Sequence, residues 1–288
     1  MLINKANLTV VILAYNEEIN IRQSLENVYL WAEHVFVLDS GSQDNTCEIS
    51  REYGAKVFYR KFDSYAKQRT HAIKNLSITT EWMLFLDADE FLLEELKEEI
   101  TSVVSKPSDF DGFYLKRRFY FMGKWIRYGG YYPTWILRLF KHKVASCERD
   151  MNEHIIVEGK VGYLHNDFVD NNKKSVTDWI EKHNKYATFE ANELIKSFDW
   201  PGNKDQLANL FGSQVERKRW LRERIWNRML PPLIRPFLYY IYRYFFRLGF
   251  MDGKVGFIYH TLHGLFYRLL IDIKFIEIKL QRKNKNRK

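Results

Sequence analysis

Short apolar runs alternate with segments of helical spacing along the first part of the chain. Residues 8–14 are apolar and β-branched, as expected of a buried strand, and the run stops at Tyr15 and Asn16. In residues 17–32, apolar side chains recur on one helical face. The alternation continues, with strands expected at 35–38, 56–59 and 82–86 and helices at about 45–53, 65–76 and 94–104. This spacing predicts an α/β fold with a mainly parallel sheet that is covered on both faces.

The pattern changes after residue 110. Strands are expected at 112–115 and 135–140, and an aromatic, glycine-rich loop separates them. Residues 155–164 predict a strand pair around Gly159. A long helix is expected at 175–196, because Ser175 and Asp178 stand at the positions of a capping box, with Asp in place of Glu.

Three of the predicted strands end in polar clusters. Tyr15-Asn16-Glu17 follows the first strand, Asp39-Ser40-Gly41-Ser42 follows the second, and Asp87-Ala88-Asp89 follows the fourth. The ligands of parallel sheets bind beyond the carboxyl ends of the strands. The sequence therefore predicts that these clusters form one site on one edge of the sheet.

The pair Asp87 and Asp89 is the most informative of these clusters. Side chains alternate along an extended chain, so the two carboxylates point the same way at the end of a buried strand. Their mutual repulsion and loss of water call for a cation. A divalent ion of the Mg²⁺ type, shared with the phosphates of a substrate, meets that need. A solvated turn after a strand is the alternative for an isolated Asp-x-Asp.

Composition adds a boundary within the chain. The 288 residues are 46% hydrophobic, which allows a sizeable core, and the two cysteines have no zinc-type spacing. The N-terminus lacks the pattern of a signal peptide, so we expect a cytoplasmic protein. Of the net charge of +9, residues 217–288 carry +14, from 18 Lys and Arg against 4 Asp and Glu. We therefore expect two parts, a catalytic domain at 1–216 and a helical, basic and aromatic extension at 217–288.

The C-terminal extension has no apolar run long enough to span a bilayer. Its longest stretch without Lys, Arg, Asp or Glu is residues 255–267, against the roughly 20 residues that a spanning helix needs. Cations interrupt the aromatic residues throughout, which predicts an amphipathic segment lying on an anionic membrane surface. A helical cap on the core with a solvated basic face is the alternative. No nucleic-acid partner is expected, because no recognised nucleic-acid motif accompanies the basic residues.

The order and spacing of four elements resemble the family-2 glycosyltransferases, which have the GT-A fold with a Rossmann-like nucleotide-binding half. The resemblance covers residues 8 to about 164. The elements are Ala14-Tyr15-Asn16-Glu17-Glu18, the segment from Asp39 to Thr46, Asp87-Ala88-Asp89-Glu90, and Asn152-Glu153-His154. More narrowly, the chain resembles bacterial lipopolysaccharide-core and surface-polysaccharide members, which share the stretch found here at 246–253.

The resemblance implies a nucleotide-diphosphate sugar donor, a UDP-sugar in the first place, and a divalent metal, Mg²⁺ or Mn²⁺. It assigns the metal to Asp89, with His165 as a possible further ligand. It assigns deprotonation of the acceptor hydroxyl to Glu153, with Asp150 as the competing carboxylate, and direct displacement with inversion. The donor-binding residues that it implies are Ala14, Tyr15, Asn16, Glu17, Asp39, Ser40, Gly41, Ser42, Lys67, Arg69, Asp87 and Ala88. For Lys67 and Arg69, a solvated helix face is the alternative.

We accordingly expect a glycosyltransferase that acts at the cytoplasmic face of the membrane on a lipid-linked saccharide acceptor, in lipopolysaccharide or surface-polysaccharide synthesis. Two other interpretations stay open. A nucleotidyltransferase would also use the Asp pair on a metal, but it would usually show a glycine-rich basic loop after the first strand. A non-catalytic membrane-surface adaptor would not need the set of Asp87, Asp89 and Glu153.

Overall fold

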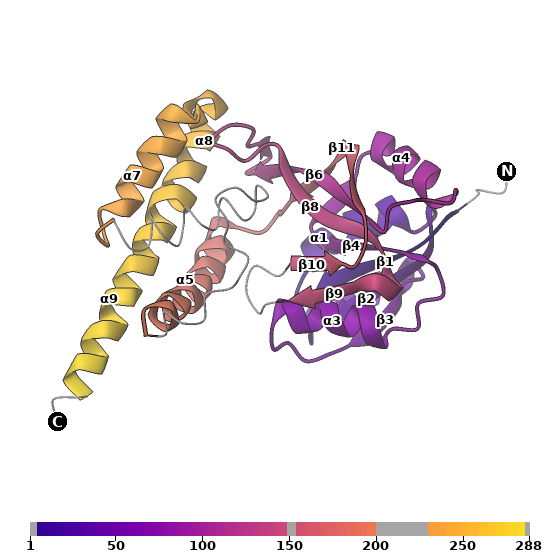
Figure 1. Cartoon of the computed structure of the whole chain (residues 1–288), viewed down its shortest axis with the longest axis horizontal. Helices are drawn as coiled ribbons and strands as arrows, with labels where there is room; N and C mark the ends of the chain where they lie inside the picture. The colour runs from indigo at the N-terminus through magenta and orange to yellow at the C-terminus, as the bar shows by residue number, and fades with distance from the viewer. Residues whose placement is uncertain (1–4, 149–153, 200–229, 286–288) are drawn as a thin grey trace. The chain divides into compact units, whose positions relative to one another are not determined.

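The computed structural model describes residues 5–148, 154–199 and 230–285, and it divides into two compact units (Figure 1). The first unit comprises residues 1–127 and 131–174, and the second comprises residues 128–130 and 175–288. The described strands all lie in the first unit, whereas the described part of the second unit is helical.

A nine-stranded sheet forms the centre of the first unit. Its order is β3-β2-β1-β4-β8-β6-β11-β5, with β7 added beside β6. The first four of these strands are parallel, β8 is antiparallel to both of its neighbours, and β11 is parallel to β6. The strands are β1 (Ala6–Ala14), β2 (Ala32–Asp39), β3 (Lys56–Tyr59), β4 (Trp82–Asp87), β5 (Glu90–Leu92), β6 (Gly112–Phe121), β7 (Lys124–Trp125), β8 (Thr134–Lys141) and β11 (Val161–Asn171).

Helices cover both faces of the parallel half of this sheet. They are α1 (Glu18–Val28), α2 (Thr46–Glu52), α3 (Tyr65–Asn75) and α4 (Glu94–Val104). On one face, Val10 and Ile12 pack in a core cluster that includes residues of α1 and α4. On the other face, Val11 packs with Phe85 and with residues of α3. Burial on both faces explains why these strands are continuous apolar runs, and the expected α/β class is confirmed.

The strand pair expected at residues 155–164 is wrong in its pairing. Residues His154–Val157 form β10, which pairs antiparallel with β9 (Ala145–Glu148) in a separate small sheet. The strand after Gly159 is β11, which instead joins the large sheet beside β6. Apolar patterning marked both strands, but it carries no information about which neighbour each strand finds.

The second unit is built around two long helices, α5 (Val176–Asp199) and α9 (Tyr267–Lys285), which pack through Ala187, Ala191, Ile271 and Phe275. The capping box expected before α5 is confirmed, because the Ser175 hydroxyl accepts the N–H of Asp178 and the Asp178 carboxylate accepts the N–H of Ser175. Short helical segments lie between α5 and α9 along the chain. They are α7 (Arg235–Ile241), a π-helical turn (Tyr242–Phe246), a 3₁₀ turn (Gly249–Asp252), α8 (Gly253–Tyr259) and a second π-helical segment (His260–Phe266).

The boundary expected at 216/217 lies outside the described residues. In the part of the chain that the structure describes, the helical unit already includes α5, which begins well before that point. No helix among the described residues combines the length and the apolar character needed to cross a membrane.

Candidate active site

The ends of three neighbouring strands meet at one edge of the sheet. Strand β1 lies between β2 and β4 and is parallel to both. Its register places Ala14 beside Asp39 and Leu13 beside Asp87. The polar clusters that follow these strands are therefore brought together, as the sequence predicts.

The cluster after β2 is a tight turn organised by Asp39. This carboxylate is only 3% exposed, and its Oδ2 accepts the N–H groups of Gly41 and Ser42 at 2.7 and 2.9 Å. Gly41 has φ +98°, a conformation that favours glycine, and a Cβ there would lie 3.3 Å from the Tyr59 ring. The Ser42 hydroxyl donates to Asp39 and accepts the N–H of Asn16 at 2.8 Å. This turn therefore ties the end of β2 to the end of β1.

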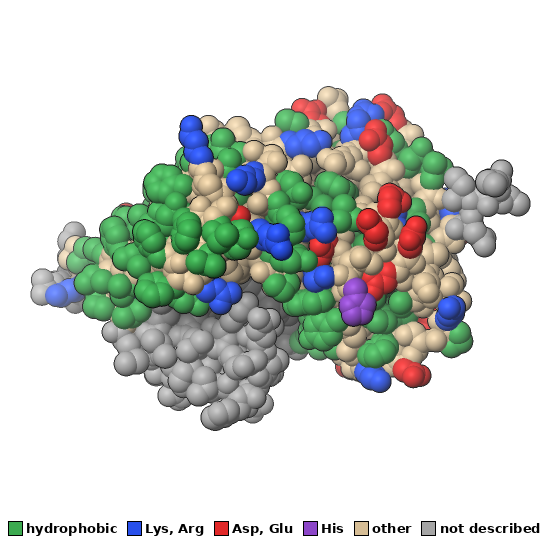
Figure 2. Space-filling view, turned by 90° about the horizontal axis from the view of Figure 1, so that it is seen from above, with side chains coloured by type: hydrophobic (Ala, Val, Ile, Leu, Met, Phe, Trp, Pro, Cys, Tyr) green, Lys and Arg blue, Asp and Glu red, His purple; other side chains and the backbone are tan. Residues whose placement is uncertain are grey.

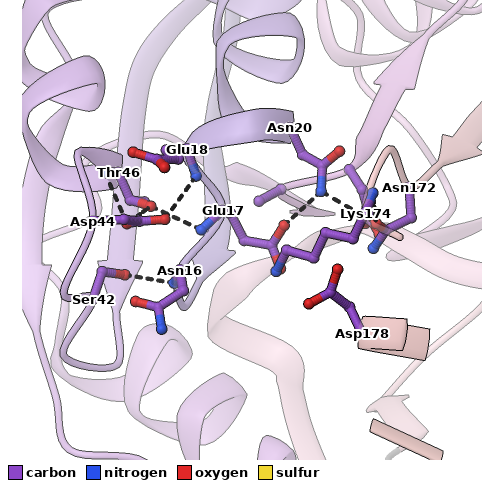
Figure 3. A network of polar contacts seen from close by, with 12 residues as sticks. Asn16, Glu17, Glu18, Asn20, Ser42, Asp44, Thr46, Asn172, Lys174 and Asp178 are labelled. Atoms are coloured by element: carbon purple, nitrogen blue, oxygen red, sulfur yellow. Dashed lines mark hydrogen bonds and ion pairs between the residues drawn. The ribbon is translucent and has the colours of Figure 1, made fainter. Parts of the chain in front are cut away.

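Asp44 connects the starts of two helices at the same edge (Figure 3). Its carboxylate accepts the N–H of Glu18 at the start of α1 and the N–H of Thr46 at the start of α2, both at 3.1 Å. Burial acts to raise the pKa of Asp44, but a hydrogen bond from the Thr46 hydroxyl, together with these two backbone N–H groups, outweighs it and holds the pKa below its ordinary value. The Thr46 hydroxyl in turn accepts the N–H of Glu17 at 2.8 Å.

A cavity of about 680 Å³ opens beside the Asp39 turn. Its volume is typical of sites for small organic ligands. Tyr15 and Tyr59 are 55% and 70% exposed, so both present aromatic surface to a ligand. Burial, together with the nearby Asp39, raises the pKa of the Cys47 thiol. The residues that line the cavity are Tyr15, Asp39, Ser40, Gly41, Ser42, Gln43, Cys47, Arg51, Val57, Tyr59 and Lys61.

Two buried arginines hold Asp87. Arg69 from α3 donates to its Oδ1 at 3.0 Å, and Arg138 from β8 donates to its Oδ2 at 2.9 Å. Arg138 also donates to Glu90, whose other oxygen accepts the Asp87 N–H at 2.8 Å. Burial raises the pKa of Glu90 and the charge of Asp87 adds to that rise, whereas Arg138 opposes it. The Asp87 carboxylate, at the end of β4, is thereby fixed in orientation.

Arg138 was not expected at the site from the sequence. A signal was present, because an arginine inside the apolar run 135–140 must find a carboxylate partner if the strand is buried. For Arg69, the solvated helix face is wrong, since the residue is 5% exposed. Lys67 does have an exposed side chain, and it lies 3.6 Å from Asp63.

Asp89 belongs to a second polar network, of which Figure 3 labels Glu17, Asn20, Asn172 and Lys174. Its Oδ2 accepts Asn172 Nδ2 at 2.7 Å. Nearby, Glu17 accepts Lys174 Nζ at 2.5 Å and Asn20 Nδ2 at 2.7 Å. Burial raises the pKa of Glu17, the charge of Asp89 adds to it, and Lys174 opposes it. Two carboxylates and one ammonium group therefore share this part of the edge.

The donor set around Asp89 suits a metal ion that a ligand completes. Among the described residues there is no group of three His, Cys, Asp or Glu side chains that could hold an ion by themselves. Hard divalent ions are commonly held by one or two carboxylates together with substrate phosphates, so Asp89 fits that chemistry. Asp87 is the less suitable ligand, because each of its oxygens already accepts an arginine.

The structure does not bring His165 to Asp89. The backbone N–H of His165 binds Glu99 of α4, whereas Asn171, six residues further along β11, binds the Asp89 carbonyl. Six residues of strand extend about 20 Å. Glu153 and Asp150 lie outside the described residues, between β9 and β10.

Ala14 and Ala88 are 4% and 3% exposed, so neither offers a side chain to a ligand. The Ala88 carbonyl is already an acceptor for the Ser24 hydroxyl, at 3.0 Å. Of the residues that sequence reasoning expected, Tyr15, Asn16, Glu17, Asp39, Ser40, Gly41, Ser42, Asp87 and Asp89 gather at the carboxyl edge of β1, β2 and β4 or line the cavity beside it.

An α/β sheet with an acidic carboxyl edge and helices on both faces agrees with the expected GT-A fold, and comparison with known proteins supports it. The model of glycosyl transferase family 2 matches residues 9–168, more than half of the chain. The chain therefore belongs to glycosyl transferase family 2.

Individual relatives cover more of the chain. The lipopolysaccharide core biosynthesis glycosyltransferase LpsC of Rhizobium meliloti is 28% identical over 68% of this chain and 74% of its own length. An uncharacterized glycosyltransferase of Rickettsia typhi is 24% identical over 95% of this chain and 88% of its own. Among solved structures, the mannosyltransferase PcManGT of Pyrobaculum calidifontis, in complex with GDP-Man and Mn²⁺, covers 94% of this chain and 87% of its own, with 13% identity and a TM-score of 0.50.

Proposed function

We propose that this glycosyltransferase transfers a sugar from a nucleotide-diphosphate sugar, a UDP-sugar in the first place, to a lipid-linked saccharide in lipopolysaccharide or surface-polysaccharide synthesis. The observation that carries the donor proposal is the cavity beside the Asp39 turn, which lies at the same sheet edge as Asp87 and Asp89. The similarity to LpsC supports the acceptor class.

In this proposal the cavity residues bind the nucleoside. Asp39 and the turn up to Ser42 receive the base, and the exposed rings of Tyr15 and Tyr59 offer stacking surface. Asp87, held by Arg69 and Arg138, faces the ribose in a fixed orientation. Fixed polar groups bind without the cost of ordering them at the moment of binding.

Asp89 would hold a divalent ion, Mg²⁺ or Mn²⁺, on the donor diphosphate. Such an ion stabilises the nucleoside diphosphate as negative charge develops on it during departure. The complex of PcManGT with GDP-Man and Mn²⁺ supports the use of a divalent ion. Lys174 lies in the same network and could exchange its contact with Glu17 for a phosphate oxygen, since a lysine ammonium binds phosphate as a point charge.

Glu153 is proposed as the base that removes the proton of the acceptor hydroxyl, with Asp150 as its competitor. A base on the side opposite the leaving group gives inversion at the anomeric carbon, in parallel with the inverting glycosidases. An α-linked donor sugar would then give a β-linked product, which NMR of the isolated product can check. An α-linkage would overturn the inverting mechanism.

The proposed function is tested by a screen of nucleotide sugars with Mg²⁺ or Mn²⁺, followed by UDP calorimetry on Asp89→Ala. We expect hydrolysis or transfer with at least one UDP-sugar, and loss of the metal-dependent part of UDP affinity in the variant. Glu193→Ala, which removes an exposed carboxylate on α5, is the control and should leave UDP affinity unchanged. If Mn²⁺ or Mg²⁺ raises the UDP affinity of Asp89→Ala as much as that of the wild type, Asp89 is not a ligand of the metal.

A lipid-linked acceptor requires the enzyme to work at a membrane. We therefore propose that it acts as a peripheral protein on the cytoplasmic face, bound to anionic lipid through its basic C-terminal part.

A further inference from the structure

Helix α7 and the π-helical turn after it expose apolar side chains and bury charged ones. The side chains of Ile234, Phe237, Leu238, Ile241 and Phe245 are between 43% and 55% exposed. They recur every three or four residues, so they form a single stripe along the helix. A surface helix in water normally turns such a stripe toward the core.

The charged residues of the same segment point inward. Arg235 is 3% exposed and forms a two-pronged ion pair with Asp272 of α9. Arg243 is 9% exposed and donates to the Gly129 carbonyl at 2.5 Å and to the Tyr239 hydroxyl at 2.7 Å. These contacts fix the rotation of the helix, so the apolar stripe cannot turn inward without breaking them.

The apolar surface continues beyond α7. We call the whole set the apolar face. Figure 2 shows hydrophobic side chains crowded over the C-terminal unit, with Lys and Arg side chains between them. The apolar face consists of the side chains of Leu233, Ile234, Phe237, Leu238, Ile241, Tyr242, Phe245, Phe246, Leu248, Phe250, Met251 and Phe257, each at least 40% exposed. Phe246 is the most exposed of them, at 75%.

Charge on the apolar face has one sign. Arg247 and Lys254 are exposed within it. Asp252 is the one carboxylate in residues 231–271, and it is 3% exposed and accepts the N–H of Tyr128. A symmetric contact between two copies would bring these cations toward each other, whereas anionic headgroups would pair with them.

We propose that the apolar face is the membrane-binding surface of the enzyme. The stripe of α7 and the turn at 245–251 insert among the lipid acyl chains, and Arg247 and Lys254 bind anionic headgroups. Aromatic and aliphatic side chains beside cations are the composition of interfacial helices. The proposal deepens the proposed function, because a lipid-linked acceptor would be presented at this surface.

The test is co-sedimentation of the full-length protein with vesicles of phosphatidylcholine and phosphatidylglycerol, and with vesicles of phosphatidylcholine alone. The variant Phe245→Ser with Phe246→Ser should weaken vesicle binding at least about tenfold, because each buried CH₂ group contributes measurably to membrane affinity. The variant Arg247→Gln with Lys254→Gln should remove the preference for phosphatidylglycerol at low salt.

A matched control comes from the same unit. Phe189 on α5 and Leu280 on α9 are 55% and 57% exposed but lie outside the apolar face. Phe189→Ser with Leu280→Ser should bind vesicles like the wild type. If this control loses binding and the Phe245 and Phe246 variant keeps it, the membrane contact lies elsewhere.

Two further readouts separate the outcomes. A wild-type dimer that becomes monomeric in the Phe245 and Phe246 variant, with no vesicle binding by either protein, would overturn the proposal in favour of self-association. UDP binding is measured beside each sedimentation, and it should be the same in all variants. Failure of UDP binding in the wild type would refute the donor proposal while leaving the membrane result to stand by itself.

Discussion

At the scale of single residues, the Asp87 network joins the fold to the site. Arg138 reaches Asp87 and Glu90 from β8, and all three groups lie at the end of β4. A buried ion pair adds little net stability over apolar packing, but the removal of one partner leaves an uncompensated charge. The network therefore serves mainly to hold Asp87 in place, and it makes the site sensitive to a single substitution.

Arg138→Met should destabilise the protein by about 3–5 kcal/mol, because Glu90 and Asp87 would lose their shared buried cation. Addition of Glu90→Gln should recover part of the loss, since it removes one of the two carboxylates. Denaturant unfolding measures both changes. Lys196→Met, which removes an exposed pair on α5, is the control and should change stability by less than about 1 kcal/mol.

Glu153→Gln should keep donor affinity and lower turnover by about 10² to 10⁴, the usual cost of losing a general base. Initial rates with a saturating donor, compared with UDP affinity from calorimetry, separate the two effects. Asp150→Asn is the matched variant. A Glu153→Gln enzyme with near-native turnover, beside a slow Asp150→Asn enzyme, would transfer the role to Asp150.

At the scale of elements, the turn from Asp39 to Ser42 decides the shape of the nucleoside cavity. Gly41→Ala should cost about 1 kcal/mol or more of stability, because φ is +98° there. The added methyl group would also lie 3.3 Å from the Tyr59 ring, so UDP affinity should fall as well.

Gly54→Ala provides the control for this prediction. Gly54 has φ +72° but nothing within 4 Å of the new methyl group, and it lies outside the cavity lining. The Gly54→Ala variant should therefore lose stability but keep the UDP affinity of the wild type. Thermal denaturation and calorimetry measure the two quantities, and an equal loss of affinity in both variants would contradict the role of the Tyr59 contact.

At the scale of the whole molecule, the helical unit should lose stability in mild acid. Burial lowers the pKa of His183 to about 4, and the positive charges of Lys182 and Arg268 add to this, although the bond to the Trp179 carbonyl opposes it. Burial also holds the pKa of His263 well below its ordinary value. The folded state thus excludes protons that the unfolded state binds.

The direction of the pH dependence of stability follows from these lowered histidine pKa values. Stability is full above the ordinary histidine pKa of about 6.5 and is lost as pH falls from there toward 4. From His183 alone we expect the free energy of unfolding to fall by about 1 kcal/mol between pH 7 and pH 5. The fall is smaller than the lowered pKa alone would give, because the imidazole is partly exposed and solvent screens its charge. His183→Phe should flatten the pH dependence of thermal unfolding, whereas His165→Phe, at an exposed position, should not.

The sequence by itself determined the class of fold and the edge that carries the chemistry. Strand and helix periods differ, and the apolar runs 8–14, 35–38 and 82–86 end in polar clusters. Parallel strands carry their carboxyl ends to one edge, so the order of these segments was enough to gather Asn16, Asp39 and Asp87. The composition of the tail likewise indicated a membrane partner, which remains a prediction.

Only the tertiary structure decided the partners of these groups. Lys174 reaches Glu17 and Arg138 reaches Asp87 across long separations in sequence, and no local period encodes such contacts. The same holds for the strand β10, which pairs with β9 rather than with the strand after Gly159. In residues 234–246 aliphatic or aromatic side chains occur on every side of the helix, so patterning could not tell which face is outward. The buried pair of Arg235 with Asp272 settles that orientation, because a guanidinium removed from water must stay with its carboxylate.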